Sequence, residues 1–313
     1  MSNNYRYLLL DVFTNRRFGG NPLAVFPDGQ GIDSKMMQAI AKEFNLSETT
    51  FVLPPTEKSA DYQVRIFTPT AELPMAGHPT VGTAFVLARE RIKAQQPPPT
   101  TLSLQEGVGI IPVTLAWDTP PAPKITMRQL LPTFGPRFEN LNTLASVLSL
   151  EPDDMMPNVP IEVVSCGVPF LIVPVKTLQA VQRIAFQQSL WERELAHLTP
   201  EILVFTQQTQ TPEANVHCRM FAPALGIAED PATGSANGPL GAYLVRYGLV
   251  PFQTPTISLL SEQGFEMGRP SLMSITIEHV DQQISGVRVG GHCVFIGEGV
   301  LEIGTHEYDE KQL

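Results

Sequence analysis

The sequence predicts an α/β protein built from two similar halves, each with a helix at its centre. Three observations predict this fold class. Strand-like and helix-like segments alternate along the chain, four short motifs recur in the second half, and the helix expected there is rich in glycine. The length of 313 residues also favours two domains. We place them at residues 1–123 and 124–293, with a strand near residues 294–303 completing the first.

The first elements follow from local patterns. Tyr7–Val12 and Leu23–Phe26 are apolar, β-rich runs separated by a Gly-Gly-Asn-Pro turn. Apolar residues at helical spacing predict an amphipathic helix over residues 35–44, with Asp33-Ser34 as its N-cap. Asn45 suits a left-handed end to this helix.

The middle of the first half predicts further strands and a second helix. We expect Ser47 and Glu48 in a short loop before a strand at Thr49–Leu53, and another strand at Val64–Thr68. Pro79 suits the first position of a helix that runs to about residue 91. The proline-rich residues 95–100 read as a linker. Those at 118–123, after a strand-like stretch at 109–117, are the expected domain boundary.

Four motifs of the first half recur in the second half in the same order. Their first residues pair as 20→167, 65→219, 78→230 and 105→262. The matched segments are Gly20-Asn21-Pro22 with Gly167-Val168-Pro169, Arg65-Ile66-Phe67-Thr68-Pro69 with Arg219-Met220-Phe221-Ala222-Pro223, His78-Pro79 with Asp230-Pro231, and Gln105-Glu106-Gly107 with Glu262-Gln263-Gly264. A domain-scale duplication explains matches at nearly one offset.

The helix predicted at Ala232–Tyr247 is poor in intrinsic propensity, since it contains three glycines and Pro239. Such a sequence makes sense where the surrounding chain leaves room only for small side chains. Strongly bent strands wrapped around a central helix would supply that environment.

Each half also leads from a strand through a loop into a proline-initiated helix start, where unpaired N–H groups can hold an anion. Gly234 would allow close approach, and the Ser235 hydroxyl adds a donor. Asp230 suits an N-cap, which by itself explains its presence; His78 is a poor cap but is often structural. Glu48 taken alone reads as a solvated loop residue.

Composition excludes several classes of function. The net charge of −10 would repel phosphate backbones, so nucleic acid is not expected as a partner. No run approaches the length of a membrane span and no signal peptide is recognisable, so a cytoplasmic location is the default. Cys166, Cys218 and Cys293 are expected to be buried free thiols. No metal-ligand spacing, P-loop, Rossmann fingerprint or nucleophile triad is present, which leaves acid–base chemistry without metal or cofactor.

Four segments carry a resemblance to a known family. Residues 20–25, 45–51, 76–82 and 229–236 closely resemble the phenazine-biosynthesis PhzF-like isomerases, and residues 263–271 resemble a late motif of that family. The resemblance runs from about residue 6 to residue 300. It is specific for the family and much less so for any one substrate.

The resemblance implies a fold like that of diaminopimelate epimerase, with two pseudo-symmetric halves, each a curved, mostly antiparallel sheet around a central helix. It implies a cleft between the halves and a homodimer. Two cysteines serve as acid and base in that relative, and motif alignment puts Ala76 and Pro231 at their positions. For this chain, the resemblance implies a site assembled from Glu48, His78 and Asp230 as catalytic residues and Ser47, Gly77, Gly234 and Ser235 as substrate-binding residues.

The sequence therefore predicts a cofactor-independent isomerase that acts on a small carboxylated metabolite, with Glu48 as the proton carrier. The phenazine-pathway member acts on trans-2,3-dihydro-3-hydroxyanthranilate, so a compound of that type is the expected substrate. Three alternatives remain open: a racemase or epimerase of an amino or hydroxy acid, a non-catalytic metabolite-binding protein, and a purely structural protein.

Overall fold

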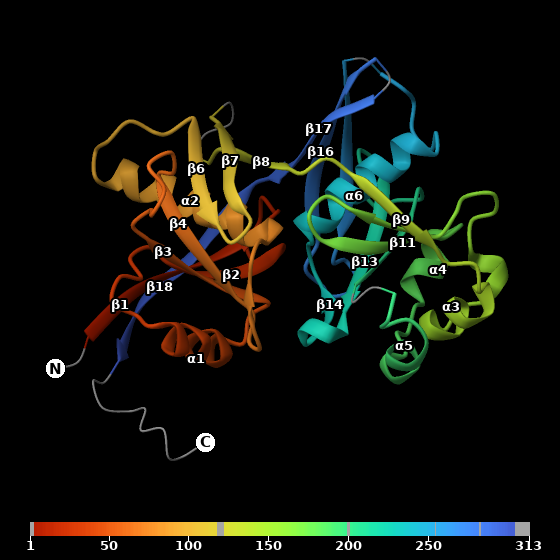
Figure 1. Ribbon diagram of the computed structural model, residues 1–313, viewed down its shortest axis with the longest axis horizontal. Coiled ribbons are helices and arrows are strands. Elements are labelled where there is room, and N and C mark those ends of the chain that lie inside the picture. Colours follow the sequence, from red (N-terminus) through yellow and green to blue (C-terminus); the bar gives the residue numbers. More distant parts are fainter. Residues whose placement is uncertain (1–2, 118–121, 199–200, 254, 282, 304–313) are drawn as a thin grey trace.

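The computed structural model describes residues 3–117, 122–198, 201–253, 255–281 and 283–303. It forms two lobes, and each lobe has a curved sheet around one helix, as predicted (Figure 1). The central helices are α2 and α6. The first half of the chain contains β1 (Asn3–Val12), β2 (Asn21–Phe26), α1 (Ser34–Phe44), β3 (Glu48–Leu53), β4 (Tyr62–Phe67), β5 (Glu72–Leu73), α2 (Gly77–Lys93), β6 (Thr101–Glu106), β7 (Gly109–Ala116) and β8 (Lys124–Gln129).

The second half carries additional short helices on one side. It contains β9 (Thr133–Arg137), α3 (Leu141–Leu148), the 3-10 helix η1 (Pro152–Asp154), β10 (Glu162–Ser165), β11 (Pro169–Pro174), α4 (Leu178–Gln182), α5 (Gln188–Glu194), β12 (Ile202–Thr206), β13 (Val216–Ala222), the 3-10 helix η2 (Pro223–Leu225), β14 (Ile227–Asp230), α6 (Gly234–Arg246), β15 (Thr256–Gln263), β16 (Ser271–Val280), β17 (Gln283–Gly291) and β18 (Cys293–Ile303).

The strand pairings repeat between the halves. The series β1-β2-β3-β4-β6-β7-β8 pairs antiparallel, parallel, antiparallel, parallel, antiparallel and antiparallel. The series β10-β11-β12-β13-β15-β16-β17 pairs in the same sequence of directions. This agreement confirms the duplication that the four motifs indicate.

Two strand contacts join the halves. The last strands of the two series, β8 and β17, pair with each other antiparallel. The chain then returns from β17 into β18, which lies antiparallel along β1 in the first lobe (Figure 1). The division at residue 123 stays a prediction, since residues 118–121 of its linker lie outside the described part.

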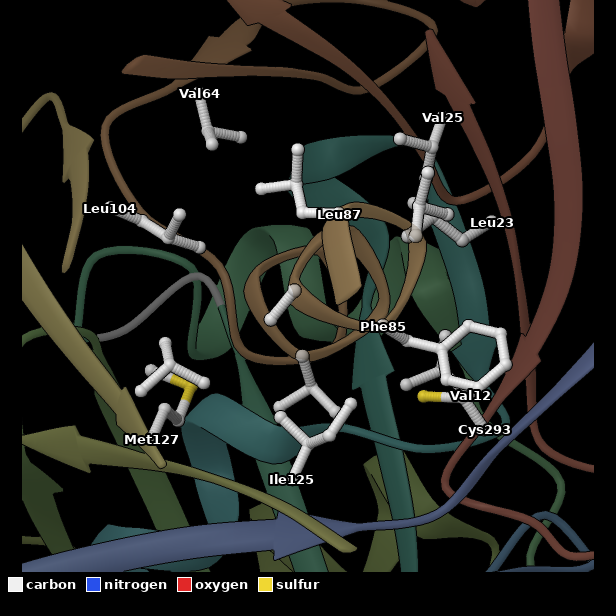
Figure 2. Packing of buried hydrophobic residues seen from close by; sticks show 14 of the residues in the cluster. Val12, Leu23, Val25, Val64, Phe85, Leu87, Leu104, Ile125, Met127 and Cys293 are labelled. Atoms are coloured by element: carbon white, nitrogen blue, oxygen red, sulfur yellow. The ribbon is translucent and has the colours of Figure 1, made fainter. Parts of the chain in front are cut away.

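The core of the first half surrounds α2. Apolar side chains from β1, β2, β4, β6 and β8 point toward α2 and form one core with its residues Phe85 and Leu87 (Figure 2). A second core surrounds α6, a third lies under α3–α5, and a small one lies under α1. Because a central helix must meet strands on nearly every side, α2 is buried all round from Gly77 to Ala88 and not only along one stripe.

Close packing around α6 explains its glycines, as predicted. A Cβ at Gly241 would stand 2.5 Å from the Ile275 side chain, and one at Gly238 would meet the Gln129 amide. Ordinary carbon contacts need about 3.5 Å, so a larger residue at either position would force its neighbour to move. The low helix propensity of this segment is therefore offset by its packing.

Several boundaries differ from the sequence-based expectation. Helix α1 begins after Asp33 and ends at left-handed Asn45, as predicted. Glu48, however, is the first residue of β3 and not a loop residue, because β3 pairs in parallel with β2 at Leu23. Helix α2 begins two residues before Pro79, and α6 begins at Gly234 instead of Ala232.

Candidate functional site

The predicted site residues meet in one cavity between the two halves. It has a volume of about 220 Å³, and its lining includes six of the seven predicted residues, namely Glu48, Gly77, His78, Asp230, Gly234 and Ser235. The seventh, Ser47, lies beside the cavity, with its hydroxyl 3.3 Å from a carboxylate oxygen of Asp230. The volume suits one small metabolite rather than a polymer.

Glu48 and His78 face each other within the first half. Glu48 begins β3 and His78 is the second residue of α2, and both side chains are at least 90% buried. Glu48 Oε2 and His78 Nε2 lie 3.3 Å apart, but their alignment does not make a hydrogen bond. Neither atom has another hydrogen-bond partner among the described residues, so both are available to a ligand.

Burial changes the protonation of this pair. It raises the pKa of Glu48 well above the usual range, and the charges of Asp230 and Glu201 raise it further. Burial also lowers the pKa of His78 to about 3. The neutral forms of both groups are therefore favoured, and a proton placed on Glu48 is held more tightly than by an ordinary carboxylate.

Asp230 reaches the cavity from the second half as the last residue of β14. It is not the N-cap of α6, as the sequence suggested, because the helix begins four residues later with Thr233 as its N-cap. Its carboxylate accepts hydrogen bonds from Asn21 Nδ2 at 2.8 Å, Thr233 Oγ1 at 2.5 Å and Ser47 Oγ. Burial raises its pKa to about 6 although these donors oppose the rise.

The two helix starts touch at glycines. A Cβ on Gly77 would stand 2.4 Å from the backbone nitrogen of Ser235, and one on Gly234 would stand 2.8 Å from the Phe13 ring. The N-caps, Ala76 and Thr233, make no side-chain hydrogen bond to their helices. Two positive helix ends thus meet at one cavity, an arrangement that favours a bound carboxylate.

The contact between helix starts corrects one predicted repeat. Gly77 and Gly234 occupy equivalent places, and their offset equals that of the Gln105 and Glu262 motifs (77→234 and 105→262, both 157 residues). His78 therefore corresponds to Ser235 and not to Asp230. By the same correspondence, Thr233 and not Pro231 is the second-half counterpart of Ala76.

Buried amides hold the second helix start in place. Gln263 Nε2 donates to the Asp230 carbonyl at 2.7 Å and to Thr233 Oγ1 at 3.0 Å. Gln129 Nε2 donates to the Gly234 carbonyl at 2.9 Å. These bonds fix the backbone on which the Asp230 side chain stands, and side chains fixed in this way are typical of a preorganised site.

One ionisable residue of the described lining was not predicted. Glu201 immediately precedes β12, is 6% exposed and lines the same cavity. Burial and the charge of Asp230 raise its pKa to about 8. No local motif marks this glutamate; only its place in the repeat could have identified it.

A larger groove lies elsewhere on the second half. It encloses about 680 Å³ and is lined by residues that include Phe134, Arg246, Phe252 and His279. No carboxyl group lies among its described lining residues, so it lacks the paired acid and base found in the smaller cavity. We therefore assign the chemistry to the smaller cavity.

The cysteines, the possible metal ligands and the helix lengths bear on other kinds of site. The three cysteines are free and buried, as predicted. Across the described residues, no group of three or more His, Cys, Asp or Glu side chains is arranged to hold a metal ion. None of the described helices combines the length and the apolar character needed to span a membrane.

Known proteins match nearly the whole chain. The family described as "Phenazine biosynthesis-like protein" matches residues 10–299. A "Trans-2,3-dihydro-3-hydroxyanthranilate isomerase" of Pseudomonas aeruginosa is 34% identical over 305 residues, covering 94% of this chain and 98% of that protein. An "Uncharacterized isomerase" of Mesorhizobium japonicum is 37% identical over 309 residues, covering 95% and 98%. A crystal structure of a PhzF-family phenazine biosynthesis protein of Bacillus anthracis has a TM-score of 0.87 at 28% identity and covers 96% of this chain and 100% of that one.

Proposed function

This chain belongs to the phenazine biosynthesis-like PhzC-PhzF family and is an isomerase of that family, and from this premise we propose that it moves a proton within a small cyclic carboxylate by acid–base chemistry, without a cofactor. The relative from Pseudomonas aeruginosa is named for trans-2,3-dihydro-3-hydroxyanthranilate. We extend that class of compound, a dihydro-hydroxyanthranilate, to the substrate of this chain.

The observation that carries the proposal is a buried glutamate facing a buried histidine in a small cavity at two helix starts. The substrate carboxylate lies at the N–H groups that open α2 and α6, beside Gly77 and Gly234. This anchor leaves the ring of the substrate between the two halves, with Glu48 on one side of it.

Glu48 acts as the proton carrier. In its ionised form it takes a proton from a ring carbon, and the C–H electron pair passes into the adjacent unsaturated system. The same carboxyl, whose proton exchanges with solvent while it is on Glu48, then returns a proton to another carbon of that system, so no atom or electron is gained or lost. A raised pKa suits this task, because it makes the carboxylate a stronger base than that of an ordinary glutamate.

His78 and Asp230 assist from either side. A neutral imidazole within reach of Glu48 can donate or accept a hydrogen bond as the proton moves. Asp230 is fixed by three donors and can orient a polar substituent of the substrate. When His78 donates this hydrogen bond, it stabilises the negative charge that develops on the substrate as the proton leaves carbon.

The test is turnover of trans-2,3-dihydro-3-hydroxyanthranilate in heavy water by the wild type, Glu48→Gln and a control, Glu43→Gln, at an exposed position of α1. We expect deuterium in the product of the wild type and of the control. Turnover by Glu48→Gln should fall by a factor of about 10² or more, as is typical when a general acid–base group is lost. Unchanged turnover and deuterium content in Glu48→Gln would remove Glu48 from this role.

The same measurement separates the alternatives. A changed position of the double bonds identifies an isomerase, and a changed stereocentre alone identifies an epimerase. Binding without deuterium exchange, in the wild type and with several cyclic carboxylates, identifies a metabolite-binding protein.

We also propose, from the family resemblance, that the protein is a cytoplasmic homodimer whose partner is a small metabolite and not nucleic acid. Sedimentation of the purified chain would measure the oligomeric state.

A further inference from the structure

Glu201 is a buried carboxyl of the cavity that the proposed proton transfer does not use. Its side chain lines the cavity together with Glu48 and Asp230, and it is as buried as they are. The position of Glu201 in the duplicated fold indicates a role for it in the cavity.

The strand register makes Glu201 the counterpart of Glu48. In the first half Thr49 pairs with Phe67, and in the second half Ile202 pairs with Phe221. Phe67 and Phe221 are equivalent, because each is the third residue of a repeated Arg-x-Phe motif. The residues immediately before Thr49 and Ile202 are Glu48 and Glu201.

The strands on the other side, β2 and β11, independently align Glu48 with Glu201. Ala24 pairs in parallel with Thr49, and Leu171 pairs in parallel with Ile202. Ala24 stands four residues after Gly20, and Leu171 stands four residues after Gly167, which begin another repeated motif. Both neighbours of the strand therefore align Glu48 with Glu201.

A pseudo-symmetric fold brings equivalent residues to the shared cavity from its two sides. Glu48 belongs to the half that contains His78, and Glu201 belongs to the half that contains Asp230. Glu48 therefore has a carboxyl counterpart that reaches the same cavity from the second half.

The charge of the lining indicates what the second carboxyl binds. Among the described lining residues there are three carboxyl groups and one histidine, but no lysine or arginine. The helix starts can hold the substrate carboxylate, whereas Asp230 and Glu201 together favour a group that donates hydrogen bonds or carries positive charge. We propose that Glu201 binds an amino or hydroxyl substituent of the substrate, on the side of the cavity opposite Glu48. This inference rests on the proposed function, since it assumes that the ring carboxylate lies at the helix starts.

The raised pKa of Glu201 fits this role. Burial and the charge of Asp230 favour the protonated carboxyl, which can donate to a hydroxyl oxygen. An ammonium group lowers the pKa of nearby carboxyls and draws Glu201 toward its ionised form. Either substituent can thus be bound by the same side chain.

The test is calorimetric binding of three probes: cyclohexanecarboxylate, 2-aminocyclohexanecarboxylate and 2-hydroxycyclohexanecarboxylate, the last two as separated stereoisomers. They share the ring and the carboxylate and differ only in the substituent. The proteins are the wild type, Glu201→Gln, Glu201→Leu and a control, Glu192→Gln, at an exposed position of α5. Urea unfolding of each variant checks that it is folded.

We expect the wild type and the control to bind one isomer of the amino or hydroxy acid at least tenfold more tightly than the unsubstituted acid. Glu201→Leu should reduce that preference to less than threefold and leave cyclohexanecarboxylate binding unchanged. Glu201→Gln should keep a preference for hydroxyl and lose one for ammonium, because an amide accepts hydrogen bonds but has no charge. These two patterns identify which substituent is bound.

Three results would overturn the assignment: no substituent preference in the wild type, a preference that survives Glu201→Leu, or equal weakening of all three probes. If no probe binds, the carboxylate site of the proposed function is refuted, and this inference falls with it. If the preference depends on Glu201 but heavy-water exchange is absent, the proposed function alone fails.

Discussion

Replacing Gly77 with alanine tests whether the contact between the two helix starts forms the site. The new Cβ would stand 2.4 Å from the Ser235 nitrogen and 2.7 Å from the Gly234 Cα. Ordinary contacts of this kind lie near 3.5 Å, so the helix starts must separate by about 1 Å. Backbone atoms cannot rotate out of the way, as a side chain could.

Two magnitudes follow from this displacement. Overpacking a core by one methyl group lowers the free energy of unfolding by about 1–3 kcal/mol, and the fixed backbone favours the upper part of that range. A shift of about 1 Å in groups that bind a substrate can reduce the rate by a factor of about 10². We therefore expect both lower stability and much weaker carboxylate binding for Gly77→Ala.

Urea unfolding and calorimetric titration with cyclohexanecarboxylate measure the two effects. Gly297→Ala in β18 is the matched control, because no heavy atom of the described chain lies within 4 Å of the place where its Cβ would stand. We expect the control to stay within about 1 kcal/mol of the wild type and to bind the probe normally. Wild-type stability and binding in Gly77→Ala would refute the close contact on which the anion site depends.

Two further predictions concern buried ionisable groups. His217 donates to Glu262 at 2.8 Å and to Glu266 at 2.9 Å, and these bonds outweigh burial and raise its pKa to about 9. The stabilisation from protonated His217 is complete below pH 6.5 and is lost as the pH rises through 9. In urea unfolding we therefore expect His217→Gln to be less stable than the wild type by about 2–3 kcal/mol at pH 6 and by much less at pH 10. Glu106 contacts Thr80 Oγ1 at 2.6 Å, and burial raises its pKa to about 8. Since this carboxyl destabilises the fold as the pH rises from 4.5 through 8, Glu106→Gln should be more stable than the wild type at pH 8.5, by on the order of 2 kcal/mol, and close to it at pH 4; equal pH profiles would contradict the prediction.

Local sequence was sufficient for features that local physics controls. Helix α1 follows from apolar spacing, a capping Asp33 and a left-handed Asn45, which all act within one helix. The glycines of α6 indicated, from the sequence alone, that other segments pack closely around this helix. Repeated motifs indicated the duplication, because equivalent halves need similar residues at equivalent turns and strands.

The main residues of the candidate site were predicted, but the secondary structure around them was not. Family-like motifs drew attention to Glu48, His78 and Asp230, and the structure brings all three to one cavity. Their surroundings were less predictable. Asp230 looked like a helix cap because a proline follows it, yet it ends a strand, and Thr233 occupies the N-cap position without a capping hydrogen bond.

Sequence by itself determined the two-half architecture, the central helices and the acidic and imidazole groups available for catalysis. Only the tertiary structure decided that Glu48 begins a strand, that Gly77 meets Gly234, and that Glu201 faces the same cavity. Each of these facts depends on the register between strands, or on contact between helices, and the residues involved lie up to 157 residues apart in the sequence, as for Gly77 and Gly234. Such contacts are chosen by packing of the whole fold, so no local pattern can specify them.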